Sequence, residues 1–428
     1  MKKNLLAAIA LFSFTGVSLS AQSTASRFDK CAVMQHEEFL DQQNPNRAAE
    51  RQTYDQNIQN YIDAHPGLAD SRSLITIPIV VHLVYKTAGQ NISDGQIQSQ
   101  ITVLNQDWTR TNADASNTPA VWTSIAGNIG VNFCLATIDP FGNATTGIER
   151  RNTTITSFST NDDVKHFSTG GLDAWDPHNY LNIWVCNMSG GILGYGEFPT
   201  ANVSQTFGVV IQFDVFGSQA VYPSGTYLAE YNLGRTTTHE FSHCFNLHHI
   251  WGDDNGACTG SDFCGDTPNQ ADATFGSPSG VVTDACSPSS PGIMYENYMD
   301  YSDDVVMNLF TNNQKSRMLA VLNSAPYNTL LLSNRCGVMG VTNISLSNGF
   351  NIHPSPTDGA FTLDFQNASP QNFDITIFNV LGEMIYTHHY DALNEAEVHL
   401  DLQGNPSGIY FVEVRNARER ITKKIVLN

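Results

Sequence analysis

Positive charge is scarce in this sequence. It has 21 lysine and arginine residues against 41 aspartate and glutamate residues, which gives a formal net charge of -20. A surface with this balance repels a polyanion over most of its area, so nucleic acids are excluded as partners. Bound calcium or a cationic substrate would suit the charge better, although many exported proteins are acidic simply for solubility.

Long apolar runs are also lacking beyond the first residues. No later segment has the roughly 20 continuous apolar residues that a membrane helix needs, so no transmembrane segment is expected in the mature protein. Residues 1–21 differ, because Lys2 and Lys3 are followed by an apolar stretch and then by small residues up to Ala21. This pattern predicts a signal peptide and therefore an exported protein.

The 428 residues are too many for one ordinary core, so two or three folded units are expected. Residues 22–72 are polar and interrupted by Pro45 and Pro66, with enough periodicity for one or two helices but little core. We interpret them as a propeptide. The β-branched run that follows Leu74 is typical of a buried strand and begins a domain assigned to residues 73–336.

The hydrophobic pattern of residues 73–336 predicts an α+β domain. A helix is expected over 94–104, strands over 132–137 and 181–186, and a long helix over 227–248. Gly, Asp, Ser and Pro dominate from Gly252 to Gly292, so this stretch is expected to be irregular and ordered by disulfides or metal ions.

Residues 345–428 alternate short apolar segments with turn residues, which predicts a separate, small all-β sandwich. Its expected strands are 361–365, 373–380, 398–402, 410–414 and 421–427.

A metal-binding pattern lies at the end of the long predicted helix, in HEFSHCFNLHHIWGD. His239 and His243 are four residues apart on one helix face, as two zinc ligands must be, and the adjacent Glu240 is placed to act as a general base. Metzincins complete such a site with a histidine six residues beyond the second, which is His249 here, with His248 as the alternative, whereas thermolysin-like enzymes use a glutamate from a later helix. A continuous helix would turn that position away, so the backbone must break first. Asn246 tolerates the positive φ that such a break needs.

A second pattern, NYMDYSDD, follows at residues 297–304. Metzincins have a methionine in a tight turn below the zinc site, and Met299 with Tyr301 two residues later matches that arrangement. A lone methionine would be interpreted as core packing. Here the turn follows the zinc motif in the right order.

Together, HEFSHCFNLHHIWGD, CGDTP at 264–268 and NYMDYSDDVVMNLFTNNQKSRM at 297–318 resemble the pappalysin family of metzincins, including its ulilysin-type members. The resemblance covers most of residues 73–335. It implies a catalytic domain with a mixed sheet, an active-site helix and an irregular lower subdomain. It also implies a secreted zinc metalloendopeptidase that hydrolyses peptide bonds through a zinc-activated water. The implied roles are zinc binding by His239, His243 and His249, general base catalysis by Glu240, and stabilisation of the tetrahedral intermediate by Tyr301.

The resemblance extends to the loop after the third histidine. The family binds calcium near this loop, and Asp253, Asp266 and Thr267 sit where oxygen ligands would be wanted. Solvated acids and turn formers are the alternative interpretation. Cys258 with Cys286 resembles a family disulfide across the same loop, and the partner of a further cysteine there, in CGDTP, stays open.

Cys31 is the candidate for keeping such an enzyme latent, because its thiolate could occupy the open zinc position. Related proenzymes commonly have Arg-x-Cys-Gly at this point, whereas this sequence has DKCA at 29–32; a disulfide or an idle thiol is the alternative. Activation requires a cut before the first strand, and Ser71, Arg72 and Ser73 offer a polar site. Since ulilysin-like enzymes favour Arg or Lys at the scissile bond, Arg72 would be an autolytic target.

The tail segments HPSPTDG, FNVLGE, SGIYFVEV and TKKIVLN resemble a type IX secretion sorting domain. This resemblance implies the type IX machinery as a partner, and release or surface attachment after outer-membrane export. A generic adhesion or carbohydrate-binding sandwich is the alternative.

Two rival functions remain beside the peptidase that acts on proteins or peptides. One is another zinc hydrolase, whose third metal ligand would be a glutamate. The other is a binding protein with a purely structural metal site. Glu240 and an open fourth metal position argue against the latter, since structural zinc normally has four protein ligands.

Overall fold

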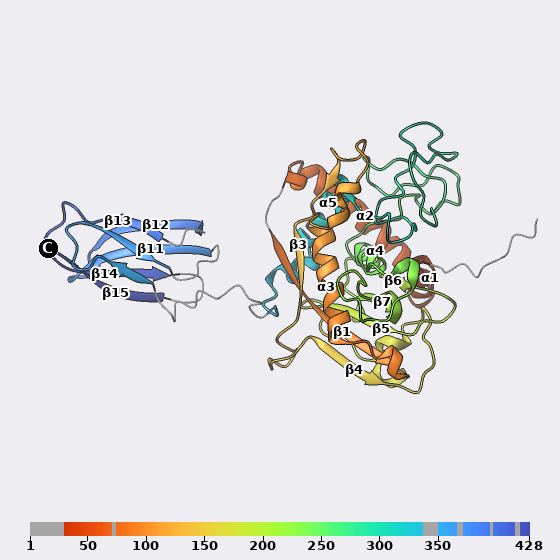
Figure 1. Ribbon diagram of the computed structural model, residues 1–428, viewed down its shortest axis with the longest axis horizontal. Coiled ribbons are helices and arrows are strands. Elements are labelled where there is room, and N and C mark those ends of the chain that lie inside the picture. The colour runs from red at the N-terminus through yellow and green to blue at the C-terminus, as the bar shows by residue number, and fades with distance from the viewer. Residues whose placement is uncertain (1–29, 71–73, 337–349, 366–370, 394–396, 416–419) are drawn as a thin grey trace, which may run out of the picture.

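The computed structural model describes residues 30–70, 74–336, 350–365, 371–393, 397–415 and 420–428 (Figure 1). The predicted signal peptide and the predicted cleavage site at residues 71–73 lie outside the described residues. Within the described part, no helix is long and apolar enough to cross a membrane.

A mixed sheet forms the centre of the first folded unit, with strand order β3-β1-β5-β7-β6 and β4 paired to β1. All neighbours are parallel except β6, which runs antiparallel to β7 at the edge. The predicted buried strand after Leu74 is β1, and both of its faces are covered, which explains its unbroken apolar run. The bounds are β1 Ile75–Tyr85, β3 Val131–Leu135, β4 Ile148–Asn152, β5 Leu181–Cys186, β6 Gly194–Tyr195 and β7 Gly208–Gln212.

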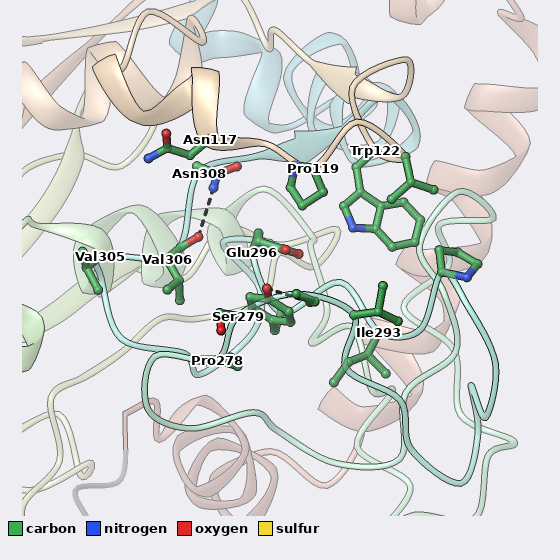
Figure 2. Close-up of a pocket in the computed structure, with 15 residues that line it drawn as sticks. Asn117, Pro119, Trp122, Pro278, Ser279, Ile293, Glu296, Val305, Val306 and Asn308 are labelled. Carbon is green, nitrogen blue, oxygen red and sulfur yellow. Dashed lines mark hydrogen bonds between the residues drawn. The ribbon is translucent and has the colours of Figure 1, made fainter.

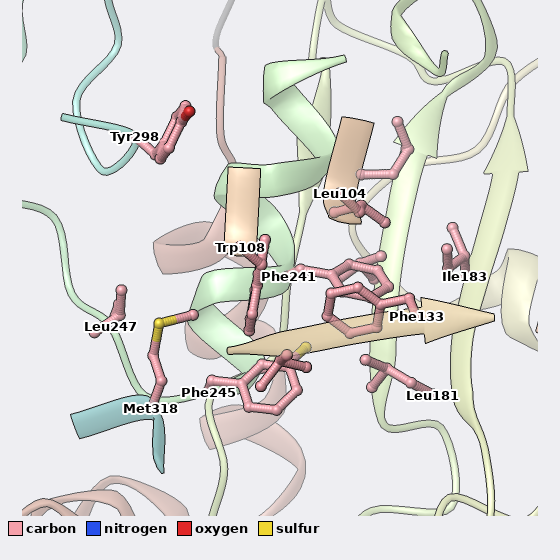
Figure 3. Packing of buried hydrophobic residues seen from close by; sticks show 14 of the residues in the cluster. Leu104, Trp108, Phe133, Leu181, Ile183, Phe241, Phe245, Leu247, Tyr298 and Met318 are labelled. Atoms are coloured by element: carbon pink, nitrogen blue, oxygen red, sulfur yellow. The ribbon is translucent and has the colours of Figure 1, made fainter. Parts of the chain in front are cut away.

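Helices α3 (Asp94–Trp108) and α4 (Arg235–Cys244) pack on this sheet and on each other. Trp108 is fully buried between them, and its ring meets the rings of Phe133 and Phe245 edge-on, each at 4.9 Å between centroids (Figure 3). This aromatic packing anchors α4 to the sheet, so the helix that bears the histidine motif has a fixed position.

The prediction of one long helix over 227–248 is wrong. Helix α4 begins only at Arg235, because Gly234 has φ +82° and the Asp304 carboxylate accepts hydrogen bonds from the backbone N–H groups of Leu233 and Arg235. The helix ends at Cys244, and two residues later Asn246 has φ +66°, the break that the motif requires.

Between Gly252 and Gly292 the chain has neither helix nor strand, as predicted. A disulfide joins Cys258 to Cys286 across this stretch. A second disulfide, which the sequence did not predict, joins Cys134 on β3 to Cys336 at the end of the unit.

Short elements complete this unit. Helix α5 spans Asn312–Asn323, and β2 (Ala126–Gly127) pairs with β8 (Phe310–Thr311). The 3-10 turns are Leu68–Asp70, Ala88–Gln90, Ala113–Asn117, Asp163–Lys165, Phe167–Thr169, Phe213–Val215, Ala229–Tyr231 and Tyr327–Leu332.

Residues 30–70, here called the N-terminal segment, form two helices, α1 (Val33–Gln43) and α2 (Arg47–Ala64). Helix α1 contacts β6 and helix α2 contacts α5 (Figure 1). Tyr54 and Ile58 of α2 belong to the main hydrophobic core. The segment therefore shares the core of the sheet domain and does not form one of its own.

The C-terminal unit contains two antiparallel sheets around a separate core, with strand orders β13-β10-β9 and β12-β11-β14-β15. This confirms the all-β prediction for the tail. Two strands, β9 and β12, were missed. The bounds are β9 Asn351–His353, β10 Ala360–Asp364, β11 Gln371–Asn379, β12 Met384–Leu393, β13 Glu397–Asp401, β14 Gly408–Arg415 and β15 Arg420–Leu427.

Candidate active site

Helix α4 places two imidazoles side by side in the interior. The Nε2 atoms of His239 and His243 lie 3.2 Å apart. On the other side of each ring, Nδ1 lies 2.7 Å from a backbone carbonyl oxygen, that of Tyr298 for His239 and that of Leu247 for His243. If each Nδ1 is the protonated nitrogen, both Nε2 lone pairs point toward the same space, which is the orientation that metal-binding histidines need.

His249 completes the group after the break at Asn246. Its ring centre lies 5.3 Å from that of His239 and 4.8 Å from that of His243. Its Nδ1 lies 2.8 Å from Asp253 Oδ1 and 3.1 Å from Asp253 Oδ2, so this carboxylate orients the ring through the nitrogen that faces away from the cluster. Asp253, a predicted calcium ligand, therefore faces the third histidine.

The alternative third ligand, His248, does not join the group. Its Nε2 lies 3.1 Å from the carboxylate of Asp55 on α2, and its ring stacks on Phe198 at 4.6 Å. The spacing argument thus selected the histidine that the fold brings to the other two.

The donor set suits a zinc ion. Donor atoms of His239, His243, His249 and Cys31 all lie within 4.8 Å of one another, and all four residues are buried. Burial lowers the pKa values of His239 and His243, with further repulsion from His249, and so favours neutral imidazoles, the form that binds metal. Three imidazole nitrogens and one sulfur are ligands that zinc prefers.

Glu240 and Tyr301 border the same space. Glu240 Oε2 accepts a hydrogen bond from Cys31 Sγ at 3.3 Å. The hydroxyl of Tyr301 donates to the backbone carbonyl oxygen of Cys31 at 3.0 Å and lies 3.3 Å from His249 Nε2. Met299, two residues before this tyrosine, is fully buried. Its backbone carbonyl oxygen accepts a hydrogen bond from the N–H of Ile250.

Cys31 is a free, buried thiol. Its Sγ lies 3.4 Å from His243 Nε2, and the next residue, Ala32, donates its N–H to the carbonyl oxygen of Gly194 on the edge strand. Burial, with a smaller contribution from the Glu240 charge, raises the pKa of the thiol. A nearby cation such as zinc would have the opposite effect and favour the thiolate.

Sequence analysis missed the role of Lys30. Its side chain is fully buried, and Nζ donates to the carbonyl oxygen of Ser302 at 2.6 Å and lies 3.1 Å from Met307 Sδ. Burial lowers the pKa of this ammonium, and the charge of Asp304 opposes the shift more than any other. The sequence signal that could have drawn attention to Lys30 was its position, because it directly precedes Cys31, the cysteine that joins the histidine cluster.

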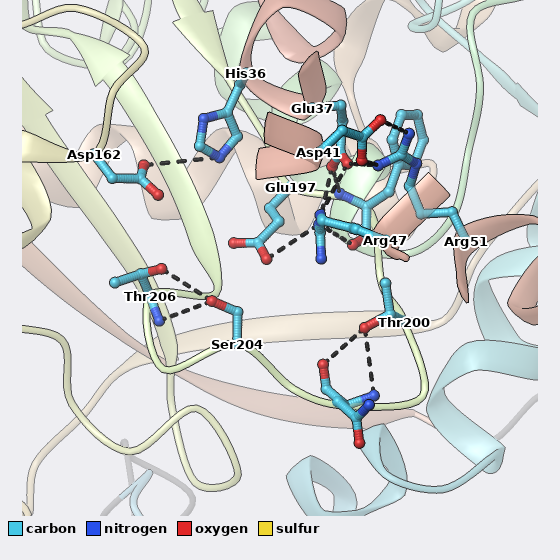
Figure 4. A network of polar contacts seen from close by, with 12 residues as sticks. His36, Glu37, Asp41, Arg47, Arg51, Asp162, Glu197, Thr200, Ser204 and Thr206 are labelled. Atoms are coloured by element: carbon cyan, nitrogen blue, oxygen red, sulfur yellow. Dashed lines mark hydrogen bonds and ion pairs between the residues drawn. The ribbon is translucent and has the colours of Figure 1, made fainter. Parts of the chain in front are cut away.

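A buried ion-pair network, also missed, attaches the N-terminal segment to the edge of the sheet domain (Figure 4). The Glu37 carboxylate accepts from Arg47, from Arg51 and from the backbone N–H of Phe198. Arg47 also donates to Glu197 at 3.2 Å and to the carbonyl oxygen of Phe198 at 3.3 Å. The segment thus occupies backbone hydrogen-bonding groups of the chain that follows strand β6.

His36 extends this network to a second pair of charges. Its Nε2 lies 3.7 Å from Asp162 Oδ1, and Lys165 Nζ lies 2.9 Å from the same oxygen and 3.9 Å from Glu197 Oε2. Burial lowers the pKa of His36 to about 4 and raises that of Glu197 to about 7. Sequence patterns offer no signal for the contact between His36 and Asp162, because these two residues are more than 100 positions apart.

The other two predicted calcium ligands, Asp266 and Thr267, do not contact the histidine cluster but form hydrogen bonds elsewhere. Asp266 accepts hydrogen bonds from the Thr311 hydroxyl at 2.6 Å and the Asn313 N–H at 2.9 Å, at the start of α5. The Thr267 hydroxyl donates to Asp262 at 2.7 Å. Among the described residues, the histidine cluster is the grouping of three or more acidic, histidine or cysteine side chains with metal-ligand proximity.

A different cavity, of about 400 Å³, lies beside Trp122, Ile293 and Glu296, and Val305 and Val306 form one side of it (Figure 2). None of the predicted catalytic or zinc-binding residues lines it. The histidine cluster in this structure is instead covered by the N-terminal segment.

Comparison with known proteins assigns both units. Residues 161–323 match the family described as pregnancy-associated plasma protein-A, the pappalysin peptidases. Residues 351–428 match the secretion system C-terminal sorting domain, which confirms the predicted export and sorting tail.

Relatives that this chain matches over most of their length agree. An extracellular metalloprotease of Arthroderma benhamiae is 32% identical over 262 residues, which are 60% of this chain and 82% of the relative. One from Pyricularia oryzae is 30% identical over 314 residues, or 72% and 93%.

Solved structures give the same assignment. Mature mirolysin of Tannerella forsythia, in complex with a cleaved peptide, is 46% identical, with a TM-score of 0.59 over 62% of this chain and 97% of that one. Promirolysin of the same organism is 41% identical, with a TM-score of 0.64 over 71% and 97%. These matches confirm the metzincin-type catalytic fold. The chain therefore belongs to the pappalysin family of metzincins and is an exported metalloendopeptidase with a C-terminal secretion sorting domain.

Proposed function

We propose that this protein is a zinc endopeptidase made as a latent precursor, with zinc held by His239, His243 and His249. The observation that carries the proposal is the convergence of these three imidazoles, with Cys31 and Glu240, in one buried cluster. When bound, zinc would lower the pKa of a water molecule and polarise the substrate carbonyl.

Glu240 is the residue that moves the proton. Its carboxylate faces the cluster and now accepts a hydrogen bond from the Cys31 thiol. With the thiol gone, the same oxygen would accept the proton of the attacking water and later give it to the leaving amine.

Tyr301 would stabilise the developing oxyanion. Its hydroxyl already donates to a peptide carbonyl oxygen at the site, that of Cys31. In the active enzyme a substrate carbonyl would take that place, and the hydrogen bond would strengthen as negative charge develops on the oxygen. Met299 belongs to the same buried core as this tyrosine, and the His249 ring meets the Tyr301 ring edge-on at 5.1 Å between centroids, so the packing restricts the position of the hydroxyl.

Latency would come from the propeptide, assigned to residues 22–72 between the signal peptide (1–21) and the catalytic domain (73–336). Cys31 would act as the fourth ligand of the metal and so exclude the catalytic water. The ion-pair network around Glu37 and Arg47 would hold the helices in place. Cleavage at Ser71, Arg72 or Ser73 would begin activation.

The surroundings of Lys30 support a preference for Arg or Lys at the scissile bond, because they already accommodate a positively charged side chain. This buried ammonium lies among acidic groups next to the cluster, and Asp304 Oδ1 is buried without a hydrogen-bond partner among the described residues. A substrate ammonium or guanidinium could use the same space. Calcium binding by Asp253, Asp266 and Thr267 stays a prediction, as does assembly with the type IX machinery through residues 345–428.

Cleavage of a panel of Arg- and Lys-containing peptides by the propeptide-free protein tests the proposal. We expect activity that is lost in Glu240→Ala and after zinc chelation. Asp304→Asn is expected to weaken the preference for basic residues, while Asp272→Asn, which removes an exposed carboxylate away from Lys30, serves as its control. Activity that survives Glu240→Ala would contradict the mechanism.

A further inference from the structure

A second cavity of about 400 Å³ lies between the N-terminal segment and the catalytic domain. Asp55 and Arg51 line it from α2, and Phe198, His248 and Phe263 line it from the catalytic domain. Asp55 Oδ1 contacts Arg317 Nη2 and lies 3.1 Å from His248 Nε2. One acidic side chain of the segment thus meets two nitrogen-bearing side chains of the enzyme.

The guanidinium of Arg317 carries a positive charge, and its contacts hold it in one position. Its side chain is fully buried, Nε donates to the carbonyl oxygen of Asn246 at 2.6 Å, and the guanidinium lies 4.7 Å from the centre of the Phe263 ring. Its Nη1 is buried without a hydrogen-bond partner among the described residues. Because a guanidinium keeps its charge and presents a planar fork, this arrangement is preorganised for a carboxylate.

The nearby carboxylates that stay with the enzyme are already engaged. Both oxygens of Asp253 lie within 3.1 Å of His249 Nδ1. Asp262 accepts from the Thr267 hydroxyl and the Cys264 N–H, and burial raises its pKa to about 6. Removal of Asp55 would therefore leave a buried cation without its contacting carboxylate, which is an unfavourable state.

We propose that, once the propeptide is gone, Arg317 and His248 form a subsite that binds a carboxylate of the substrate, with Asp55 standing in for it in the precursor. This inference rests on the proposed function, in which residues 22–72 are removed. The subsite borders the catalytic cluster, since His248 precedes His249 and Phe198 contacts both His248 and, at 5.1 Å between ring centres, His243. The carboxylate would be an acidic side chain or the free C-terminus of a peptide.

Matched peptides test the subsite on the propeptide-free enzyme. Each peptide has the same basic residue at the scissile bond, and Asp replaces Asn at one position at a time; a further pair differs only in a C-terminal acid or amide. We expect one pair to show at least a tenfold higher kcat/KM for the carboxylate member, the effect of one charge-assisted hydrogen bond.

Substitutions then identify the responsible cation. In Arg317→Gln the ratio within that pair should approach one, whereas Lys315→Gln, which removes an equal charge two residues away on α5, should preserve it. Because Arg317 is buried, His248→Gln at the edge of the cavity is a second variant, expected to reduce the ratio several-fold. Ratios near one for every pair, or a ratio that Arg317→Gln leaves unchanged, would overturn the subsite.

A binding measurement separates this inference from the proposed function. A synthetic peptide of residues 31–64 and its Asp55→Asn form are titrated calorimetrically into propeptide-free Glu240→Ala protein. We expect the substituted peptide to bind at least tenfold more weakly, and equal affinities would overturn the subsite. Absence of cleavage of any peptide by the wild-type enzyme would instead contradict the proposed function, because the calorimetric result does not depend on catalysis.

Discussion

Replacing Cys31 by alanine in the uncleaved precursor is expected to activate the enzyme partly. The thiol lies 3.3 Å from Glu240 Oε2 and 3.4 Å from His243 Nε2, so alanine removes the group that faces both the base and the metal ligands. The rest of the docking surface, including the Arg47–Glu197 pair, is unchanged. The precursor should therefore open more often without losing its fold.

The size of the effect follows from the contact that is lost. A hydrogen bond that involves a charged group contributes about 1.5–3 kcal/mol, and a metal–sulfur bond would add to this. The open fraction should therefore rise roughly 10- to 150-fold. Hydrolysis of a fluorogenic Arg or Lys peptide measures it, while gel analysis confirms that the precursor remains uncut.

Cys186→Ala is the matched control, because Cys186 is another free, buried cysteine and lies on β5, outside the cluster. It should leave the precursor silent. A Cys31→Ala precursor as silent as the wild type would refute the switch, and equal activation by both substitutions would show that general loosening is responsible.

Three further predictions concern stability and metal retention. Burial holds the pKa of His36 at about 4, below the ordinary 6.5, so the stability of the precursor relative to His36→Gln should fall by up to about 3 kcal/mol as pH falls from 6.5 to 4; the raised pKa of Glu197 acts in both proteins and cancels in this difference, which thermal unfolding measures, and a difference that does not change with pH would contradict it. Asp253→Asn should weaken zinc retention about 10- to 100-fold because the third histidine loses its orienting partner; competition with a chelator measures this, and the exposed Asp272→Asn should have no effect. Replacing Cys134 and Cys336 by alanine should cost about 5 kcal/mol, since they close a loop of 202 residues; a denaturation midpoint equal to that of the wild type would exclude this contribution.

Sequence patterns predicted the parts of the site that depend on local spacing. The three histidines lie within eleven residues, and the requirement for a break between the second and third pointed to Asn246, which indeed has positive φ. Buried strands such as β5 were also predictable from their unbroken apolar runs. These features are fixed by neighbouring residues along the chain.

Contacts between distant residues were not predictable in the same way. The start of α4 depends on Asp304, about 70 residues later, so hydrophobic periodicity alone extended the helix too far. The burial of Lys30, and the pairing of Asp55 with Arg317 across 262 residues, depend on how the N-terminal helices dock. Strand β12 was missed because its sequence, MIYTHHYDAL, is polar on an exposed face and lacks a clear apolar alternation.

The zinc content of purified protein tests the central claim most directly. Elemental analysis should find one zinc ion per chain in the wild type, in Glu240→Ala and in His248→Ala, and a large loss of zinc in His249→Ala. Zinc that persists in His249→Ala but disappears from His248→Ala would contradict the assignment of the third ligand. A wild-type protein that is catalytically active without any zinc would contradict the account as a whole.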